Sequence, residues 1–343
     1  MEKIKPMRLI ICSIFLLFIG TSNPVFAKSS LQPTPFLMPG GEGGTGFDDL
    51  NYSSSLHKVL VPGGRTGKLY LIDSRTKKIS TINGFSVENN YNGGHRQSIT
   101  SADEGEGFIF TADRNALRIY MMDPLSKEVV ASAQLTGGPD YVRFIKPVSE
   151  VWVTEPGRER IEIFTLSTLS KPMLTQSGFI EVPGGPESLI LDHSTQHAYT
   201  HLWEGKTAAI NIHTHAIINQ WPNACGGSRG IAEDEKNGFL FAGCVEGKIV
   251  VLDLKHNGKQ LASLSTGAGV DIIGYNPALA HLYLSGADSA TLSVIGVSNQ
   301  GKLSLLGMGK AVEGAHCVTG DDQGDIWVCD PQHGQLLLYK DNF

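Results

Sequence analysis

Short apolar segments separated by polar turns recur along almost the whole chain. The segments are rich in β-branched and aromatic residues, as in Lys58–Val61, Gly107–Thr111 and Glu150–Thr154. This composition, with Gly, Asn and Asp in the turns, is typical of β-strands. No stretch has the periodicity of an amphipathic helix. The pattern therefore predicts an all-β protein.

The predicted strands fall into seven repeats. Each repeat begins with small residues and an ionisable residue, and these ionisable positions are Asp48, Arg96, Asp140, Glu187, Arg229, Asp271 and His316. Successive positions are 42 to 48 residues apart, which is close to the spacing of propeller blades. A first strand, a second strand, a third strand and a more polar fourth strand follow. Four short strands repeated seven times predict a seven-bladed β-propeller, formed by residues 28–343 as a single domain.

The two ends of the chain are expected to meet in the last blade. The last repeat ends at Phe343 after three strands, without a fourth. Near the N-terminus, Thr34–Gly41 resembles the fourth strand of the third repeat, Phe179–Gly185. We therefore predict that an N-terminal strand completes the last blade and closes the ring without an unpaired edge.

Residues 1–27 have the features of a secretory signal peptide. Lys3, Lys5 and Arg8 precede the apolar run Leu9–Gly20, and Val25–Ala27 places small residues at a cleavage site. The run has twelve residues, fewer than the roughly 20 that cross a bilayer. We therefore expect cleavage, no membrane span in the mature chain, and export to the periplasm or outside the cell.

The charge of the chain argues against a nucleic-acid partner. The sequence contains 28 Lys and Arg against 34 Asp and Glu, a net charge of -6. The signal segment contains three of these cations and one of the anions, so its removal leaves -8. Binding to phosphates needs a clustered basic surface, and the sequence has no such cluster.

Four cysteines remain after the signal segment, and export favours disulfides between them. Cys317 and Cys329 flank a predicted turn at Asp322–Gly324, which places them on neighbouring strands. Cys225 and Cys244 both lie at the same end of the fifth repeat. We therefore predict two disulfides, each within one blade. No C-x-x-C pair supports a zinc ribbon or a thioredoxin-like site.

The repeats also carry a family resemblance. Glu150–Leu166 (EVWVTEPGRERIEIFTL) resembles the repeat after which the YVTN proteins are named, although Trp152 and Glu155 stand where that motif has Tyr and Asn. Cys225–Asp253 and Gly267–Ile295 are similar to blades of YncE-like exported propellers. The resemblance implies a β-propeller of WD40-like repeated blades and export. It implies little chemistry, because functions in the family are diverse.

The seven ionisable positions are expected to form a ring. In a propeller the first strand of each blade is innermost and starts near one mouth of the central channel, so these side chains should converge there and perturb one another's pKa values. Asp140, Glu187 and Asp271 could supply oxygen ligands to Ca²⁺ or Mg²⁺. The other interpretation is that Arg96 and Arg229 pair with neighbouring acids and only stabilise the ring.

Five histidines gather in the fourth repeat: His193, His197, His201, His213 and His215. If the hairpin tip lies near Gly205, His197 falls roughly opposite His213. Two or three imidazoles at that place could bind Zn²⁺ or Cu²⁺. The simpler interpretation is that they are polar residues of an outer strand and its loops, since no H-E-x-x-H spacing occurs.

The sequence favours a non-catalytic exported propeller that binds a protein or a small molecule, because no nucleophile–base or metal-ligand motif accompanies the repeat. We assign no catalytic residue and no cofactor beyond a divalent cation at the ring. The alternative is a divalent-metal-dependent hydrolase or lyase at the channel mouth, with His316 as base. A third hypothesis is a subunit that serves a periplasmic redox enzyme.

Overall fold

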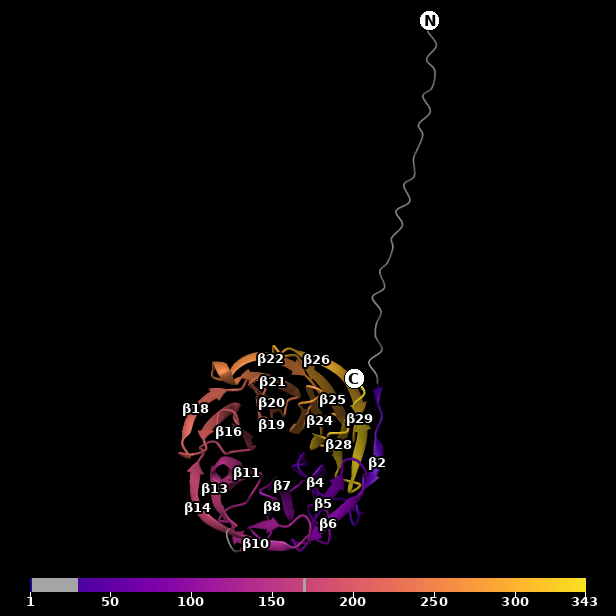
Figure 1. Cartoon of the computed structure of the whole chain (residues 1–343). Helices are drawn as coiled ribbons and strands as arrows, with labels where there is room; N and C mark the ends of the chain where they lie inside the picture. Colours follow the sequence, from indigo (N-terminus) through magenta and orange to yellow (C-terminus); the bar gives the residue numbers. More distant parts are fainter. Residues whose placement is uncertain (2–29, 169–170) are drawn as a thin grey trace.

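Residues 30–343 form a ring of seven β-sheets around one axis (Figure 1). The structure is a computed structural model that describes Met1, residues 30–168 and residues 171–343. The predicted signal segment, residues 1–27, lies outside the described residues. Strands that follow one another within a blade pair antiparallel. The predicted all-β, seven-bladed propeller is confirmed.

Each blade has four strands stacked from the axis outward, and in blades one to six they follow one another in chain order. The outer strand of blade seven comes from the N-terminal segment, and a further N-terminal strand joins the sheet of blade six. In blades one and two the strands are β3 (Asn51–Ser53), β4 (Lys58–Pro62), β5 (Lys68–Asp73), β6 (Ile79–Asn83), β7 (Ile99–Gly105), β8 (Phe108–Asp113), β9 (Arg118–Met122) and β10 (Val129–Gln134). In blades three and four they are β11 (Val142–Ile145), β12 (Glu150–Glu155), β13 (Arg160–Ser167), β14 (Met173–Glu181), β15 (Ile190–Asp192), β16 (His197–Leu202), β17 (Lys206–Asn211) and β18 (Ile217–Pro222).

The remaining three blades follow the same plan. Blades five and six contain β19 (Ser228–Asp234), β20 (Phe239–Cys244), β21 (Lys248–Asp253), β22 (Lys259–Ser265), β23 (Val270–Asn276), β24 (His281–Gly286), β25 (Thr291–Val297) and β26 (Leu303–Lys310). Blade seven contains β27 (Val318–Gly320), β28 (Asp325–Asp330), β29 (Gln335–Lys340) and β2 (Thr34–Leu37). Single turns of 3₁₀ helix lie at η1 (Lys146–Val148), η2 (Pro156–Arg158) and η3 (Leu254–His256).

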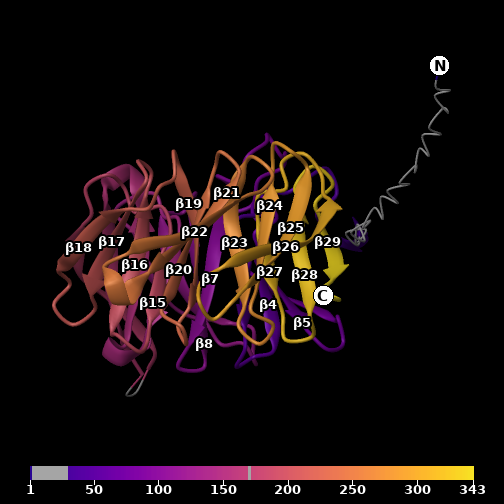
Figure 2. The ribbon, with the colours of Figure 1, turned by 90° about the horizontal axis from the view of Figure 1, so that it is seen from above.

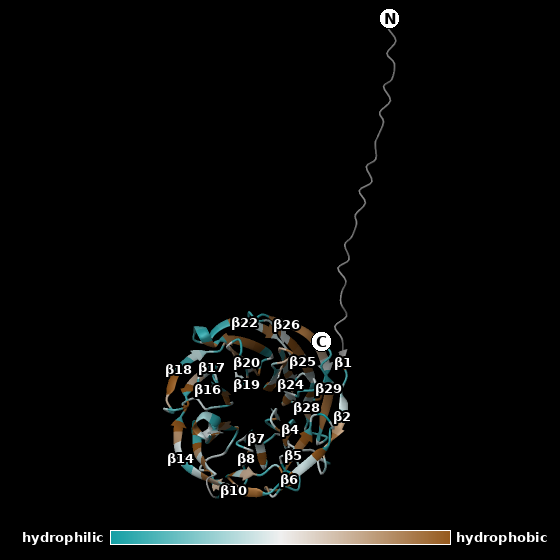
Figure 3. Ribbon diagram, viewed as in Figure 1, coloured by the Kyte–Doolittle hydropathy of each residue, from teal (hydrophilic) through white to brown (hydrophobic). Residues whose placement is uncertain are grey.

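The blades are held together by apolar side chains on both faces of their middle strands. In β4, for example, Val59, Leu60 and Val61 are all 0 % exposed, because one face packs on each neighbouring blade. The outer strands are more polar, although apolar residues reach β14 and β18 as well (Figure 3). Burial between stacked sheets therefore drives the fold, and Figure 2 shows the blades standing side by side around the ring.

The N-terminal strand closes the ring, as predicted. β2 pairs antiparallel with β29, from Thr34 opposite Leu338 to Leu37 opposite Gln335. The ring of Phe36 meets the edge of Trp327 with 5.0 Å between centroids. The sequence did not predict β1 (Ser30–Leu31), which pairs parallel with β26 and joins the N-terminal segment to blade six as well.

Both predicted cysteine pairs lie within single blades. Cys225 and Cys244 have a Cα–Cα distance of 5.2 Å in blade five, and Cys317 and Cys329 are 5.5 Å apart in blade seven. Both pairs form disulfides, which confirms the predicted pairing. Within the part of the chain that the structure describes, no helix has the length and hydropathy of a membrane span.

Candidate functional site

The central channel has two ends with different chemistry. We call one end the ring mouth: it comprises two adjoining cavities of about 440 and 310 Å³ that share His95, Arg229 and Asp271. The other end is the wide channel, a cavity of about 830 Å³ lined by residues from all seven inner strands and the turns that follow them. All three cavities are therefore assembled from residues far apart in the sequence.

All seven ionisable residues singled out in the sequence lie at the ring mouth. Arg96, Asp140, Glu187, Arg229 and Asp271 line the larger cavity, and His316 lines the smaller one. The seventh residue, Asp48, lies behind His95, with 2.8 Å between its Oδ2 and the Nδ1 of His95. The structure thus brings them together at one end of the channel.

Local hydrogen bonds fix the ring residues to their own blades. The backbone N–H of Asp140 donates to the carbonyl of Thr154 at 2.9 Å, and that of Glu187 donates to the carbonyl of His201 at 2.9 Å. In each case a residue before the inner strand is joined to the end of the second strand. Gly185 precedes Glu187 with φ 77°, a left-handed conformation that favours glycine.

Arginines neutralise the acids of the ring mouth. Arg114 contacts Asp140 directly and lies 3.5 Å from Asp48. Arg229 lies 3.4 Å from Glu187. The structure therefore places Arg114, and not Arg96, between the acids. Arg96 is exposed and forms no ion pair with any residue that the structure describes.

An aromatic side chain completes this surface. Trp203 is 44 % exposed, donates its indole N–H to Glu187, and lies under the guanidinium of Arg229 with 5.9 Å to the ring centroid. Trp203 and Arg96 therefore present an indole and a guanidinium to solvent beside a charged cavity.

The three predicted metal ligands do not form a cluster. Among the described residues, the sets whose ligand atoms lie within 4.8 Å of one another are Asp48–His95–His316 and His316–Cys317–Cys329. Asp140, Glu187 and Asp271 are not such a set, and two of them are paired with arginines instead. The two ring nitrogens of His316 face the carbonyls of Phe47 at 2.9 Å and Gly314 at 2.8 Å. The cysteines of the second set form a disulfide.

Burial and charge act in opposite directions on the pKa values at the ring mouth. Attraction by Asp48 raises the pKa of His95 to about 9. Burial raises the pKa of Asp48, but the attraction of His95 and Arg114 outweighs burial and leaves that pKa below its ordinary value. Burial likewise raises the pKa of Glu187. The ring mouth therefore holds a protonated His95 against an ionised Asp48 at neutral pH.

This pair predicts a pH-dependent stability. The pKa of His95 rises from 6.5 to about 9 on folding, so the pair stabilises fully below pH 6.5 and its contribution is lost as the pH rises through 9. Solvent reaches 33 % of the His95 side chain and screens the pair. We expect wild type to lose about 1–2 kcal/mol relative to His95→Gln between about pH 6 and pH 10. Urea unfolding of both proteins at several pH values measures this loss. A difference in the free energy of unfolding that stays the same at every pH would contradict the pairing.

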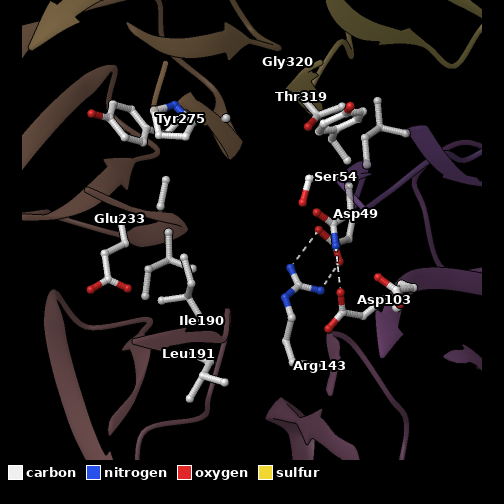
Figure 4. Close-up of a pocket in the computed structure, with 18 of the residues that line it drawn as sticks. Asp49, Ser54, Asp103, Arg143, Ile190, Leu191, Glu233, Tyr275, Thr319 and Gly320 are labelled. Atoms are coloured by element: carbon white, nitrogen blue, oxygen red, sulfur yellow. Dashed lines mark hydrogen bonds and ion pairs between the residues drawn. The ribbon is translucent and has the colours of Figure 1, made fainter. Parts of the chain in front are cut away.

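A buried ion pair between Arg143 and Asp49 lies in the wall of the wide channel. Arg143 donates to both carboxylate oxygens of Asp49, at 2.7 and 3.1 Å. The hydroxyl of Ser101 donates to Asp49 at 2.6 Å, and the guanidinium lies over Tyr141 with 5.0 Å to the ring centroid. Figure 4 shows this pair on one wall of the channel, next to Asp103.

Two further carboxyl groups of the wide channel form no ion pair with a cation among the described residues, although Arg143 lies close enough to Asp103 to attract it. Asp103 accepts hydrogen bonds from the N–H of Phe144 at 2.8 Å and from Asn51 at 3.2 Å, and burial raises its pKa to about 6. Burial, with repulsion from Asp192, raises the pKa of Glu233 to about 9. Both groups are desolvated without a full compensating charge.

Comparison with known proteins shows the fold alone. No protein-family model and no curated protein matches the chain. Similar solved structures include a chain of the "Mitotic Checkpoint Complex" (TM-score 0.72, 11 % identity, 99 % of both chains covered). They also include the Cps50 (Swd1) β-propeller domain of Myceliophteria thermophila, with a TM-score of 0.71 and 10 % identity over 90 % of this chain and 99 % of that chain. A third is hydrazine synthase of Kuenenia stuttgartiensis, with a TM-score of 0.70 and 10 % identity over 87 % of this chain and 96 % of that chain.

The residues that follow the second strand of each blade also form the ring mouth, and the repeat of ionisable positions did not indicate them. Sixteen residues after Asp140, Glu187, Arg229 and Asp271 stand Pro156, Trp203, Val245 and Ala287, and all four line the ring mouth. Arg114 follows β8 in the same way. This second periodicity could have been found by aligning the repeats on their second strands.

The predicted facing of His197 and His213 is wrong. Leu202 pairs with Lys206, so the hairpin tip falls one residue earlier than expected and His197 lies opposite Asn211. His201 is buried and bonded to Thr207 at 2.9 Å and to the carbonyl of Phe241 at 3.3 Å. These histidines therefore do not assemble into the expected metal site.

Proposed function

We propose that this protein is an exported, non-catalytic scaffold of the YVTN/YncE-like kind that binds a partner protein at the ring mouth. The observation that carries the proposal is the exposed pair of Trp203 and Arg96 beside a cavity of about 440 Å³. Tryptophan and arginine are the residues that most often dominate the energy of protein interfaces.

The ionic contacts of the ring mouth support a binding role over catalysis. Asp140 and Glu187 are engaged by Arg114, Arg229 and Trp203. Such mutually paired groups form a rigid charged surface that orients a partner. The carboxylates are held in these contacts, and so they are poorly placed to act as general bases.

Export is supported by the predicted signal peptide and by the two disulfides. Disulfides persist in the periplasm and outside the cell and are rare where thiols are kept reduced. Blades five and seven each contain one such cross-link. The partner is therefore expected in the same oxidising compartment.

Affinity capture from an extract of that compartment tests the proposal. Immobilised mature protein is compared with the Trp203→Ala/Arg96→Ala variant and with Phe179→Ala, which removes an exposed aromatic of the outer strand β14. Wild type and Phe179→Ala should retain the same partner, and the double variant should lose it by about thirtyfold or more. Equal capture by all three would refute binding at the ring mouth.

The alternative function is a divalent-metal-dependent hydrolase or lyase. The set Asp48–His95–His316 favours it, since its ligand atoms lie within 4.8 Å of one another. Metal binding would require His316 to give up a carbonyl contact. Protein purified without chelators should then contain one metal ion per chain that His95→Gln abolishes. Protein that contains no metal and shows no thermal shift with Ca²⁺, Mg²⁺ or Zn²⁺ would exclude this function.

A further inference from the structure

The wide channel is large enough for a small organic ligand. Its volume of about 830 Å³ is within the range of pockets that enclose drug-sized molecules. Residues from all seven inner strands line it, so its walls are as rigid as the propeller itself. It lies at the opposite end of these strands from the ring mouth, and a ligand there would not depend on the partner proposed above.

The charges that face this cavity are unbalanced. Arg143 donates two hydrogen bonds to Asp49, which neutralises its charge. Asp103, Glu104 and Glu233 also line the cavity, and none of the three forms an ion pair with a cation among the described residues. Oε1 of Glu233 is shielded from solvent, and the protonated carboxyl group of Glu233 faces the carboxylate of Asp192. Seven carboxyl groups line the cavity against two cationic side chains, Arg143 and Lys146, so acidic groups are in excess.

The walls also combine aromatic and aliphatic surface. Tyr52, Tyr141 and Tyr275 line the cavity, and aromatic faces attract cations. The guanidinium of Arg143 already forms such a cation–π contact with the ring of Tyr141. Ile190 and Leu191 lie on the wall that carries Glu233, across the channel from Asp103 (Figure 4).

We propose that the wide channel binds an amphipathic organic cation, an ammonium compound with an apolar chain. Asp103 neutralises one ammonium group, Glu233 releases its proton to solvent and pairs with the other, the tyrosines contact them through their ring faces, and Ile190 and Leu191 pack against the chain. An inorganic cation would use the carboxylates and leave the aromatic and aliphatic walls without a role. An anion would meet the same carboxylates and be repelled.

Isothermal titration with four probes tests the chemistry of the ligand. The probes are 1,8-diaminooctane, the neutral 1,8-octanediol, the anionic suberate and Ca²⁺, each titrated into the mature protein. We expect one 1,8-diaminooctane per chain and no binding of the other three. Equal binding of the diol, or binding of Ca²⁺ alone, would overturn the proposal, as would the absence of diamine binding.

Variants locate the site. Glu233→Gln and Asp103→Asn should each weaken the binding of 1,8-diaminooctane by about tenfold or more, because each removes a carboxyl group that is ionised when the ammonium group is bound. Glu181→Gln, at an exposed position at the end of β14, should bind like wild type. Glu233→Gln also removes a carboxyl group that has no cation paired with it. The urea concentration at the midpoint of its unfolding should therefore be no lower than that of wild type. Unchanged binding by both folded channel variants would refute the assignment.

Discussion

Arg143→Met is expected to lower the free energy of unfolding by about 3–5 kcal/mol, because it leaves a buried carboxylate without its counter-charge. The side chain of Asp49 is only 4 % exposed, so water cannot replace the guanidinium. Asp103 lies on the same wall and already has a raised pKa, which adds to the cost. Equilibrium unfolding in urea at neutral pH measures the loss.

Two comparisons separate the ion pair from the loss of side-chain bulk. Arg75→Met, at an exposed turn position, should change stability by less than about 0.5 kcal/mol. Adding Asp49→Asn to Arg143→Met should restore a large part of the loss, since the unpaired charge is then gone. A double variant as unstable as Arg143→Met alone would show that this ion pair does not couple blades one and three.

A chain that begins at Pro39 is expected to lose about 4–6 kcal/mol of stability. It lacks β2, and with it the four-residue pairing to β29, the fully buried Met38 and the contact of Phe36 with Trp327. Each well-buried apolar side chain contributes about 1.5–3 kcal/mol, and the freed edge of β29 also favours aggregation. Thermal and urea unfolding of the truncated and mature proteins measure the effect.

A shorter truncation is the matched control. A chain that begins at Pro33 lacks β1 but keeps β2, so blade seven stays complete. It loses mainly the buried Leu31, which is worth about 1.5–3 kcal/mol. If both truncations cost the same, β2 would not be the element that closes the ring.

The fold could be predicted because a blade is a local unit that recurs in the sequence. The interval between ionisable residues such as Asp140, Glu187 and Arg229 is set by the length of one blade. The closing strand could be predicted because Thr34–Gly41 repeats the pattern of a fourth strand. β1 escaped notice because a two-residue parallel pairing with β26 has no sequence signature.

The contacts within the site were harder to predict than its location. A periodic position indicates which end of the channel a residue occupies, but its partner depends on the neighbouring blade. Arg114 pairs with Asp140 from the blade next to it, whereas Arg96 on the predicted position is exposed. Asp103 and Glu233 are each followed by a second acid near the end of an inner strand, and such a polar strand end is equally typical of a strand that leads into a solvent-exposed turn.

Photocrosslinking at the ring mouth tests the central claim most directly. p-Benzoylphenylalanine is placed at Trp203 or, as control, at Phe179; the two positions are 44 % and 39 % exposed, but Phe179 lies on the outer strand β14. After irradiation of cells that express the protein, position 203 should yield a single adduct with one partner protein and position 179 should not. The same adduct at both positions, or none at position 203, would contradict a binding site at the ring mouth.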